Sequence, residues 1–331
     1  MPPFPMNVLA GGNEANSRFR RTGQRSISRV EIRDLEYFLA CCNARSFAEA
    51  ARRVHIVSSA MSCAIARLEQ DLGVPLFDRA GGHIALTEQG EALQLAAQRV
   101  MSAVQAAKDE VAEACGQVRG TVVLGSTLHT GQLDLAAVFS QVREHHPGVV
   151  IQLRQSPTGS AGLVQAVRDA SVDIALTAST GSARGVVLHP LFTEPMVFIC
   201  RPGHRLSGHS QVSVADLREE MILRPPPGWG TRAVIDAALG ATDSAFEVGN
   251  YALMARLVHA GFAPTLAPAS AMSGDMLAGL RAVPIDDSRL CWSLSAAVSA
   301  DRRMTAAAQV LLDALIEGSA GCAREPDSVP R

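Results

Sequence analysis

The pattern of apolar and polar positions changes several times along the chain and predicts a multidomain protein. Residues 1–29 are rich in Pro, Gly, Asn, Ser and Arg and show no apolar periodicity, whereas a regular pattern begins abruptly at Val30. We therefore expect residues 1–29 to be a disordered tail. The alternative is a misassigned start, because bacteria can begin translation at a valine codon and Val30 would then be the first residue.

The spacing of apolar residues predicts three helices between residues 32 and 72. The first carries an apolar stripe formed by Ile32, Leu35, Phe38 and Leu39. Ser46, three residues before Glu49, has the spacing of a capping box, which would open a short helix over Phe47–Arg53. The third helix is expected over Ser58–Leu72, and the left-handed conformation available to Gly73 would end it.

A tight turn between two short extended pieces is expected at residues 80–83. Helix, short helix, turn, longer helix and hairpin follow one another as in a winged helix-turn-helix, and we assign this fold to residues 30–87. The second helix of such a motif enters the major groove of double-stranded DNA. The residues expected to contact DNA are Ser46, Arg53, Ser58, Ser59, Ser62, Arg67 and Arg79.

Residues 88–118 form one long helical stretch with apolar residues at alternating spacings of four and three. These residues are Leu93, Ala97, Val100, Val104, Ala107, Val111 and Ala114. Such a seam is typical of a coiled coil, so we expect this linker helix to pair with that of a second subunit in a homodimer or homotetramer. The alternative is a helix that packs on its own domain.

Between residues 119 and 318, β-rich apolar runs alternate with helical segments, the pattern of an α/β fold with a mostly parallel sheet. Strands are expected at Thr121–Gly125, Val149–Leu153, Val172–Leu176, Met196–Cys200 and Met221–Leu223. Helices are expected at Leu133–His145, Ala161–Arg168, Thr231–Leu239, Tyr251–Ala260 and Thr305–Ile316. Residues 319–331 are expected to form a second disordered tail.

Charge supports DNA binding only in one place. The chain of 331 residues has a net charge of −2, so any basic surface must be local. Residues 45–67 carry a net charge of +3, whereas the wider stretch 31–119 carries −3. The basic character is therefore confined to the helix-turn-helix.

Other features of the composition favour a cytoplasmic protein without a catalytic site. No apolar run reaches the roughly 20 residues of a membrane span, and the N-terminus lacks a secretory pattern. The seven cysteines are odd in number and lack C-x-x-C spacing, which favours reduced thiols over a redox pair. No G-x-S-x-G, H-E-x-x-H or P-loop motif occurs, and the adjacent His145 and His146 make a poor metal pair, so neither a metal nor a bound cofactor is expected.

Five motifs follow one another within about sixty residues: Leu35-Glu36-Tyr37-Phe38-Leu39, Ser46-Phe47 with Ala50-Ala51, Arg67-Leu68-Glu69, Leu72-Gly73-Val74-Pro75-Leu76-Phe77-Asp78-Arg79 and Leu86-Thr87-Glu88-Gln89-Gly90. Together they resemble the signature of LysR-type transcriptional regulators. The rest of the chain resembles this family too, including Arg119-Gly120 and the segment 224–232.

The recognition helix departs from the family at two positions. Where the family often has glutamine and arginine, this chain has Ser58 and Cys63. Arginine is the usual bidentate reader of guanine, and cysteine cannot replace it. We therefore still expect DNA binding, but at a target sequence unlike the common sites of the family and with modest affinity.

The resemblance implies that residues 119–318 form an effector-binding domain shaped like a periplasmic binding protein, with two α/β lobes and a cleft between them. It also implies a small-molecule co-inducer, self-association and RNA polymerase as a candidate partner. Ligands of open α/β sheets lie at the carboxyl ends of strands, where helix N-termini suit an anion. This rule gives nine expected effector contacts: Ser126, Thr127, Ser156, Thr158, Thr177, Arg224, Trp229, Thr231 and Asn250. The alternative for each Ser, Thr or Asn is that it only caps a helix.

Three other interpretations compete with an effector-controlled regulator. A transport protein with the same lobes is disfavoured by the extra residues 30–118 and by the missing secretory pattern. An enzyme with an appended winged helix would need an acid, base or nucleophile in the cleft, and none is evident. A regulator that has lost sequence-specific binding is suggested by Cys63.

Overall fold

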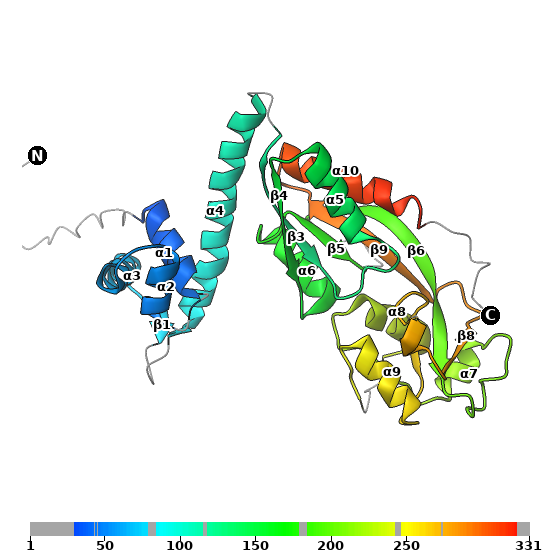
Figure 1. Cartoon of the computed structure of the whole chain (residues 1–331). Coiled ribbons are helices and arrows are strands. Elements are labelled where there is room, and N and C mark those ends of the chain that lie inside the picture. Colours follow the sequence, from blue (N-terminus) through cyan, green and yellow to red (C-terminus); the bar gives the residue numbers. More distant parts are fainter. Residues whose placement is uncertain are drawn as a thin grey trace, which may run out of the picture.

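The computed structural model describes residues 30–42, 44, 46–78, 84–114, 118–178, 184–241, 246–272 and 274–322. The predicted tail at 1–29, the turn at 80–83 and Arg79 lie outside the described residues, as does most of the predicted C-terminal tail. Figure 1 shows a small helical unit and a larger α/β unit joined by one long helix. None of the helices in the described ranges is both long and apolar enough to span a lipid bilayer.

The helical unit has the predicted winged arrangement. It consists of α1 (Ile32–Cys42), α2 (Phe47–Arg53), α3 (Ser58–Leu72) and the antiparallel hairpin of β1 (Phe77–Asp78) and β2 (Ala85–Leu86). The bounds predicted for α2 and α3 are confirmed. Ser46 caps α2 by accepting a hydrogen bond from the Glu49 N–H at 3.2 Å, and Gly73 ends α3 with a φ of 72°.

A compact apolar core holds the helical unit together. Phe38, Met61 and Ile65 are fully buried, and the Phe77 ring packs against that of Phe38 with centroids 5.4 Å apart. Ile32, predicted as part of the same stripe, is half exposed and does not belong to this core.

Only part of the apolar seam predicted for the long helix α4 (Glu88–Ala114) packs against other residues of the chain. Ala97 is buried in the core of the helical unit, and Leu93 packs against the same core. Val100 and Val111 lie three turns apart on one helix face and are 39% and 68% exposed. Lys108, the only lysine of the chain, is exposed one turn before Val111.

The α/β unit contains one seven-stranded sheet in the order β4-β3-β5-β9-β6-β7, with β8 paired to β6. Its strands are β3 (Gly120–Ser126), β4 (Val149–Gln155), β5 (Ile174–Thr177), β6 (Val186–Cys200), β7 (Thr265–Pro268), β8 (Arg281–Pro284) and β9 (Cys291–Ser299). Only β4 and β5 pair with β3 in parallel; the pairings of β9 with β5 and of β6 with β7, β8 and β9 are antiparallel. The prediction of a mostly parallel sheet was therefore wrong.

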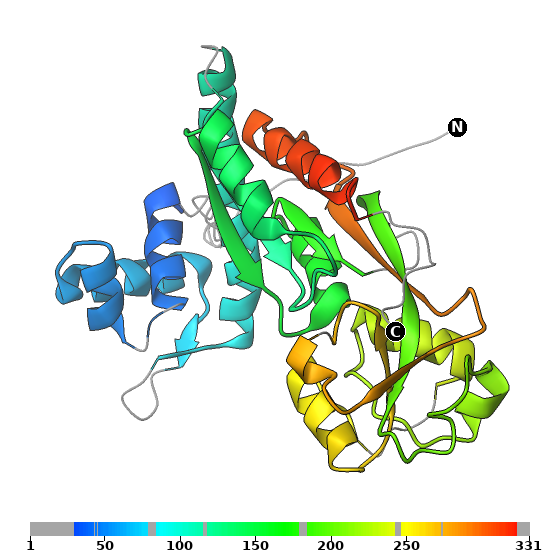
Figure 2. The ribbon, with the colours of Figure 1, turned by 45° about the vertical axis from the view of Figure 1, so that its right-hand side comes forward.

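The two long strands β6 and β9 explain the mixed sheet, because they run through both lobes (Figure 2). Residues 186–195 of β6 pair with β9, with a register shift between Pro190 and Phe192. Residues 196–200 of the same strand pair with β7 and β8. We call the part built on β3, β4 and β5 lobe 1, and the part built on β7 and β8 lobe 2.

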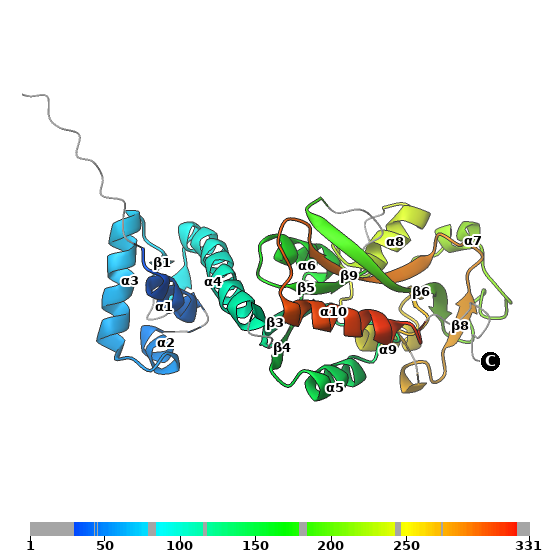
Figure 3. The same cartoon turned by 90° about the horizontal axis from the view of Figure 1, so that it is seen from above.

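Helices cover both faces of lobe 1. In Figure 3, α5 (Leu135–His145) and α10 (Ala306–Ser319) lie together on one face, while α6 (Gly159–Arg168) packs on β5 and β9 from the other. Lobe 2 carries α7 (Val214–Arg218), α8 (Gly230–Leu239), α9 (Tyr251–His259) and the 3₁₀ turn Gly274–Met276. The five helices predicted for this unit are confirmed within two or three residues at most ends. Residues 221–223 form no strand, and only Leu223 makes an isolated bridge, to Thr265.

Candidate functional site

The N-terminal end of α3 presents a polar surface. Ser58 and Ser59 are exposed in its first turn, and Ser62 is half-buried one turn later. Cys63 is exposed on the same helix. The N-cap position is Val57, so no side chain there accepts from the first N–H groups of α3. Hydroxyls and free N–H groups together suit phosphate oxygens and base edges.

Two arginines predicted to contact DNA already have carboxylate partners. Arg67 donates to the buried carboxylate of Asp34 in α1, and this contact ties α3 to α1 and raises the pKa of Arg67. Arg53 donates from Nη2 to Glu49 Oε1 at 2.7 Å. Both guanidiniums still face solvent, with 60% and 50% of their side chains exposed, so each can also meet a phosphate.

A cleft lies between the two lobes, and four of the predicted effector contacts line it: Thr127, Ser156, Trp229 and Thr231. The other lining residues are Leu128, His129, Gly159, Ser160, Ala178, Gly230, Tyr251 and Trp292. The cavity has a volume of only about 20 Å³, close to the space of one water molecule, so the lobes are closed. Both tryptophans of the chain are among these residues.

The structure places the remaining predicted residues beside or behind the cleft. Ser126 is buried and donates to the Thr127 carbonyl at 2.8 Å, and Thr158 shares a hydrogen bond of 3.0 Å with Ser156. Thr177 is fully buried, and its Oγ1 has no hydrogen-bond partner among the described residues. Asn250 caps α9 by accepting from the Leu253 N–H at 2.9 Å.

Arg224 has a structural position inside lobe 2. Its Nη1 donates to Asp236 Oδ1 at 2.5 Å and to the Gly240 carbonyl at 3.0 Å. The side chain is 6% exposed and does not line the cleft. We therefore do not include Arg224 among the proposed effector contacts.

The N-termini of α6 and α8 meet at the cleft from opposite lobes. Gly159 and Ser160 begin α6, and Gly230 and Thr231 begin α8. A Cβ on Gly230 would lie 1.9 Å from the Ala178 carbonyl oxygen, so this close approach of the lobes requires glycine. Thr231, predicted as the cap of α8, lies inside the helix, and its Oγ1 shares a 2.9 Å hydrogen bond with the Tyr251 hydroxyl.

These two helices differ from the others of the α/β unit in their caps. At α5, α7, α9 and α10 a side chain accepts from the first turn: Asp134, Ser213, Asn250 and Thr305. At α6 and α8 the cap positions are Thr158 and Trp229, and neither side chain makes such a bond. One N–H of α6, that of Ala161, donates across the lobes to the Gly228 carbonyl at 3.1 Å. The cleft thus combines two positive helix ends that lack side-chain caps.

A polar network adjoins the cleft through His129, which lines it. His129 Nε2 lies 3.1 Å from Ser270 Oγ, and Ser270 donates from Oγ and N to the buried carboxylate of Glu194 at 2.6 and 2.8 Å. The His129 ring contacts those of Tyr251 and Trp292, with centroid distances of 5.5 and 5.3 Å. Burial raises the pKa of Tyr251 to about 12, so its hydroxyl keeps its proton near neutral pH.

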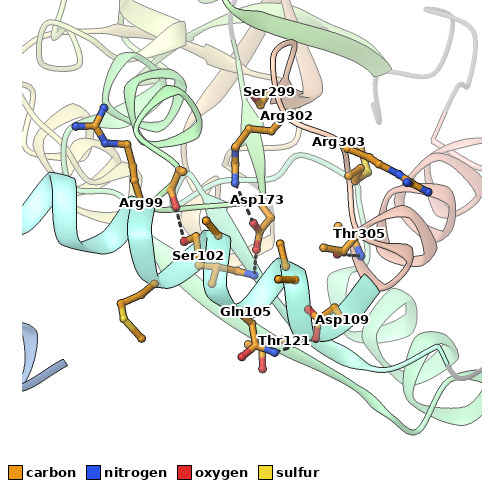
Figure 4. Close-up of a pocket in the computed structure, with 18 of the residues that line it drawn as sticks. Arg99, Ser102, Gln105, Asp109, Thr121, Asp173, Ser299, Arg302, Arg303 and Thr305 are labelled. Atoms are coloured by element: carbon orange, nitrogen blue, oxygen red, sulfur yellow. Dashed lines mark hydrogen bonds and ion pairs between the residues drawn. The ribbon is translucent and has the colours of Figure 1, made fainter. Parts of the chain in front are cut away.

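A larger cavity of about 690 Å³ lies between α4 and lobe 1 (Figure 4). Across it, Ser102 Oγ donates to the Ala170 carbonyl at 2.9 Å. On the lobe side, Asp173 accepts a hydrogen bond from the Val123 N–H at 2.9 Å and lies 3.8 Å from Arg302. Burial raises the pKa of Asp173, although both of these contacts lower it. This junction joins α4, and through it the helical unit, to lobe 1.

Sequence reasoning missed several residues in and next to the cleft for identifiable reasons. His129 follows Thr127 by two positions. The rule that ligands bind at the carboxyl ends of strands would have included it if two more residues after the strand had been considered. Glu194 and Trp292 lie on strand segments that were not predicted at all. No local signal connects Ser270 to His129, which is 141 positions away.

Comparisons with known proteins establish the family. A family model described as the LysR substrate binding domain matches residues 116–320, and one described as the bacterial regulatory helix-turn-helix protein, lysR family, matches residues 32–91. The chain therefore belongs to the LysR family of DNA-binding transcriptional regulators, as its motifs indicate, and its relatives are regulators rather than enzymes.

Named relatives and solved structures agree with this assignment. The chain is 28% identical to the regulator CfxR of Cupriavidus necator over 62% of this chain and 64% of that one, so the match spans less than two thirds of that relative. It is 29% identical to the dual regulator GltC of Bacillus subtilis over 73% and 81%. The fold is shared with a full-length OxyR variant of Pseudomonas aeruginosa, with a TM-score of 0.64 and 20% identity over 86% of this chain and 97% of that one. It is also shared with CbnR bound to its target DNA, with a TM-score of 0.62 and 21% identity over 89% of this chain and 100% of that one.

Proposed function

We propose that this regulator binds a specific DNA site through α3 as a homodimer, which can assemble further to a homotetramer. We also propose that its activity is controlled by a small organic anion held between the lobes. It acts on the chromosome and hence in the cytoplasm, with RNA polymerase as the partner through which transcription changes. The observation that carries the effector proposal is the absence of side-chain caps at α6 and α8, the two helices whose N-termini meet in the cleft.

The effector is proposed to be anionic because helix N-termini without side-chain caps and aligned peptide dipoles favour negative charge. An anion between Ser160 and Thr231 would be held by both lobes at once. It would favour one arrangement of the lobes over the other, which is what a switch requires. Trp229 and Tyr251 offer apolar surface for the remainder of the molecule.

Self-association is proposed through α4. Leu93 and Ala97 pack in or against the core of the helical unit, whereas Val100 and Val111 form an apolar stripe that is exposed to solvent. Pairing α4 with its copy would cover this stripe and bring two α3 helices to one DNA duplex, as paired half-sites require.

The DNA-binding surface can be tested by thiol protection. Cys63 is exposed on α3, whereas burial raises the pKa values of Cys41 and Cys42 to about 12 and should leave those thiols unreactive. Alkylation of the full chain, read by peptide mass spectrometry, should therefore modify Cys63 and should be slowed at least tenfold by the DNA upstream of the gene.

Cys322, which follows α10, is the internal control: burial raises its pKa too, so it should react more slowly than Cys63, but at the same rate with and without DNA. Scrambled DNA at physiological salt should protect Cys63 far less than the upstream DNA. If DNA binds but Cys63 stays reactive, α3 is not the helix in the groove. Equal protection by scrambled DNA at all salt concentrations would contradict sequence-specific binding.

A further inference from the structure

The lining of the cleft contains one side chain that can become positively charged. Among the described residues that line it, none is Arg, Lys, Asp or Glu, and His129 is the only histidine. An imidazole changes its charge near neutral pH. The charge of this cleft can therefore change at one residue.

His129 is held by groups from four other elements. Ser270, after β7, donates its hydroxyl proton to Glu194 and therefore accepts from His129 Nε2–H, and Glu194 of β6 lies 3.9 Å from the same nitrogen. Glu194 is 4% exposed, and Ser270 donates two hydrogen bonds to its carboxylate. Tyr251 of α9, a neutral phenol, and Trp292 of β9 both contact the ring. Glu194 is the acidic group in this set, and its carboxylate is near enough to Nε2 to pair with an imidazolium.

We propose that His129 determines the charge specificity of the cleft: its imidazolium, held by Glu194, is the cation that an anionic effector meets, so effector binding takes up a proton. This inference rests on the proposed anion-binding function of the same cleft. It adds a residue and a regulatory property, since the two helix N-termini alone would bind an anion equally well at every pH.

The sign of the effect follows from linkage. An anion that binds beside His129 binds better to the protonated form, so its affinity is full at low pH and falls as pH rises and His129 loses its proton. If the anion binds only the imidazolium form, Kd increases up to tenfold for each pH unit above that transition. A cleft that relies on peptide dipoles alone gives a constant Kd.

The test uses acetate as the probe and the full-length chain. Acetate stays ionised at pH 6 and pH 8, and chloride keeps the ionic strength constant. Because Trp229 and Trp292 both line the cleft and are the only tryptophans, intrinsic fluorescence reports its occupancy. We expect the Kd for acetate to be at least tenfold lower at pH 6 than at pH 8 in the wild-type chain, and equal at the two pH values in His129→Gln.

The chain offers a matched control. His204 Nε2 lies 3.2 Å from Glu220 Oε2, and its side chain is 17% exposed, as is that of His129, but it lies outside the cleft. His204→Gln should keep the pH dependence. Circular dichroism establishes that each variant is folded.

The outcomes separate this inference from the proposed function. Equal affinity at the two pH values in the wild-type chain, or a pH dependence that persists in His129→Gln, overturns the role of His129 and leaves the anion site standing. If acetate produces no saturable change at either pH, both the anion site and the role of His129 are overturned.

Discussion

His55 lies in the turn between α2 and α3 with a φ of 57°, a left-handed conformation that glycine adopts freely and other residues adopt at a cost of roughly 1 kcal/mol. Its side chain is exposed, so its replacement disturbs little else. We predict that His55→Gly is more stable than His55→Ala by about 0.5–1 kcal/mol, because the two variants differ only in the Cβ. Urea unfolding of both variants measures this difference, and an equal or higher stability of the Ala variant would show that the turn is unstrained.

At the same scale, single residues were predictable where their role is local. Ser46 and Gly73 act on backbone groups within four positions, and their roles as helix cap and helix end could be predicted from spacing. Arg224 was expected at the cleft, but its partner Asp236 lies on the next helix and holds it inside lobe 2. Likewise, His129 has its contacts with Ser270 and Glu194 only because the lobes bring distant segments together.

Among the elements, α6 connects the two ends of lobe 1. Its first residues, Gly159 and Ser160, line the cleft, and the Ala170 carbonyl just after its last turn accepts the hydrogen bond from Ser102 of α4. Ala170 has a φ of 57°, the left-handed conformation that ends many helices. A displacement of α6 when the cleft is occupied would therefore reach α4 directly.

This contact gives a prediction for Ser102→Ala. Loss of one hydrogen bond weakens the junction by about 1 kcal/mol, so amide hydrogen exchange in residues 103–111 should become roughly fivefold faster. Residues 89–97, which pack on the helical unit, should exchange as before.

Ser171→Ala is the matched control, because the Ser171 hydroxyl bonds to the Ala166 carbonyl within the same turn and does not reach α4. Faster exchange in this control as well, or unchanged exchange in Ser102→Ala, would mean that the Ser102–Ala170 bond does not stabilise α4 against lobe 1.

Helices could be predicted from the sequence better than strands, for a physical reason. The amphipathic period of α5, α8 and α9 is a property of the segment itself. In contrast, the first half of β6 and all of β9 belong to strands that cross between lobes, and their pairing partners are about a hundred residues away. Because these strands are antiparallel to their neighbours, the overall sheet is mixed although the βα order suggested a parallel one.

For the whole molecule, the exposed stripe of α4 predicts the assembly state. Val100→Glu combined with Val111→Glu would place like charges at the centre of a paired interface, so the chain should sediment as a monomer. Leu253→Glu on α9 is the control, since Leu253 is also about half exposed but lies far from α4, and it should leave the assembly unchanged. Sedimentation velocity measures both. A dimer that survives the double substitution would place the interface elsewhere.

The single lysine on α4 has a practical consequence for chemical labelling. Apart from the N-terminal amine, Lys108 is the one primary amine of the chain, and it is exposed near Val111. An amine-reactive dye would therefore report from the linker helix without an engineered cysteine. A short bifunctional succinimidyl ester would, in turn, join two subunits almost entirely through this helix, so that the cross-linked species would record how two copies of α4 lie against each other.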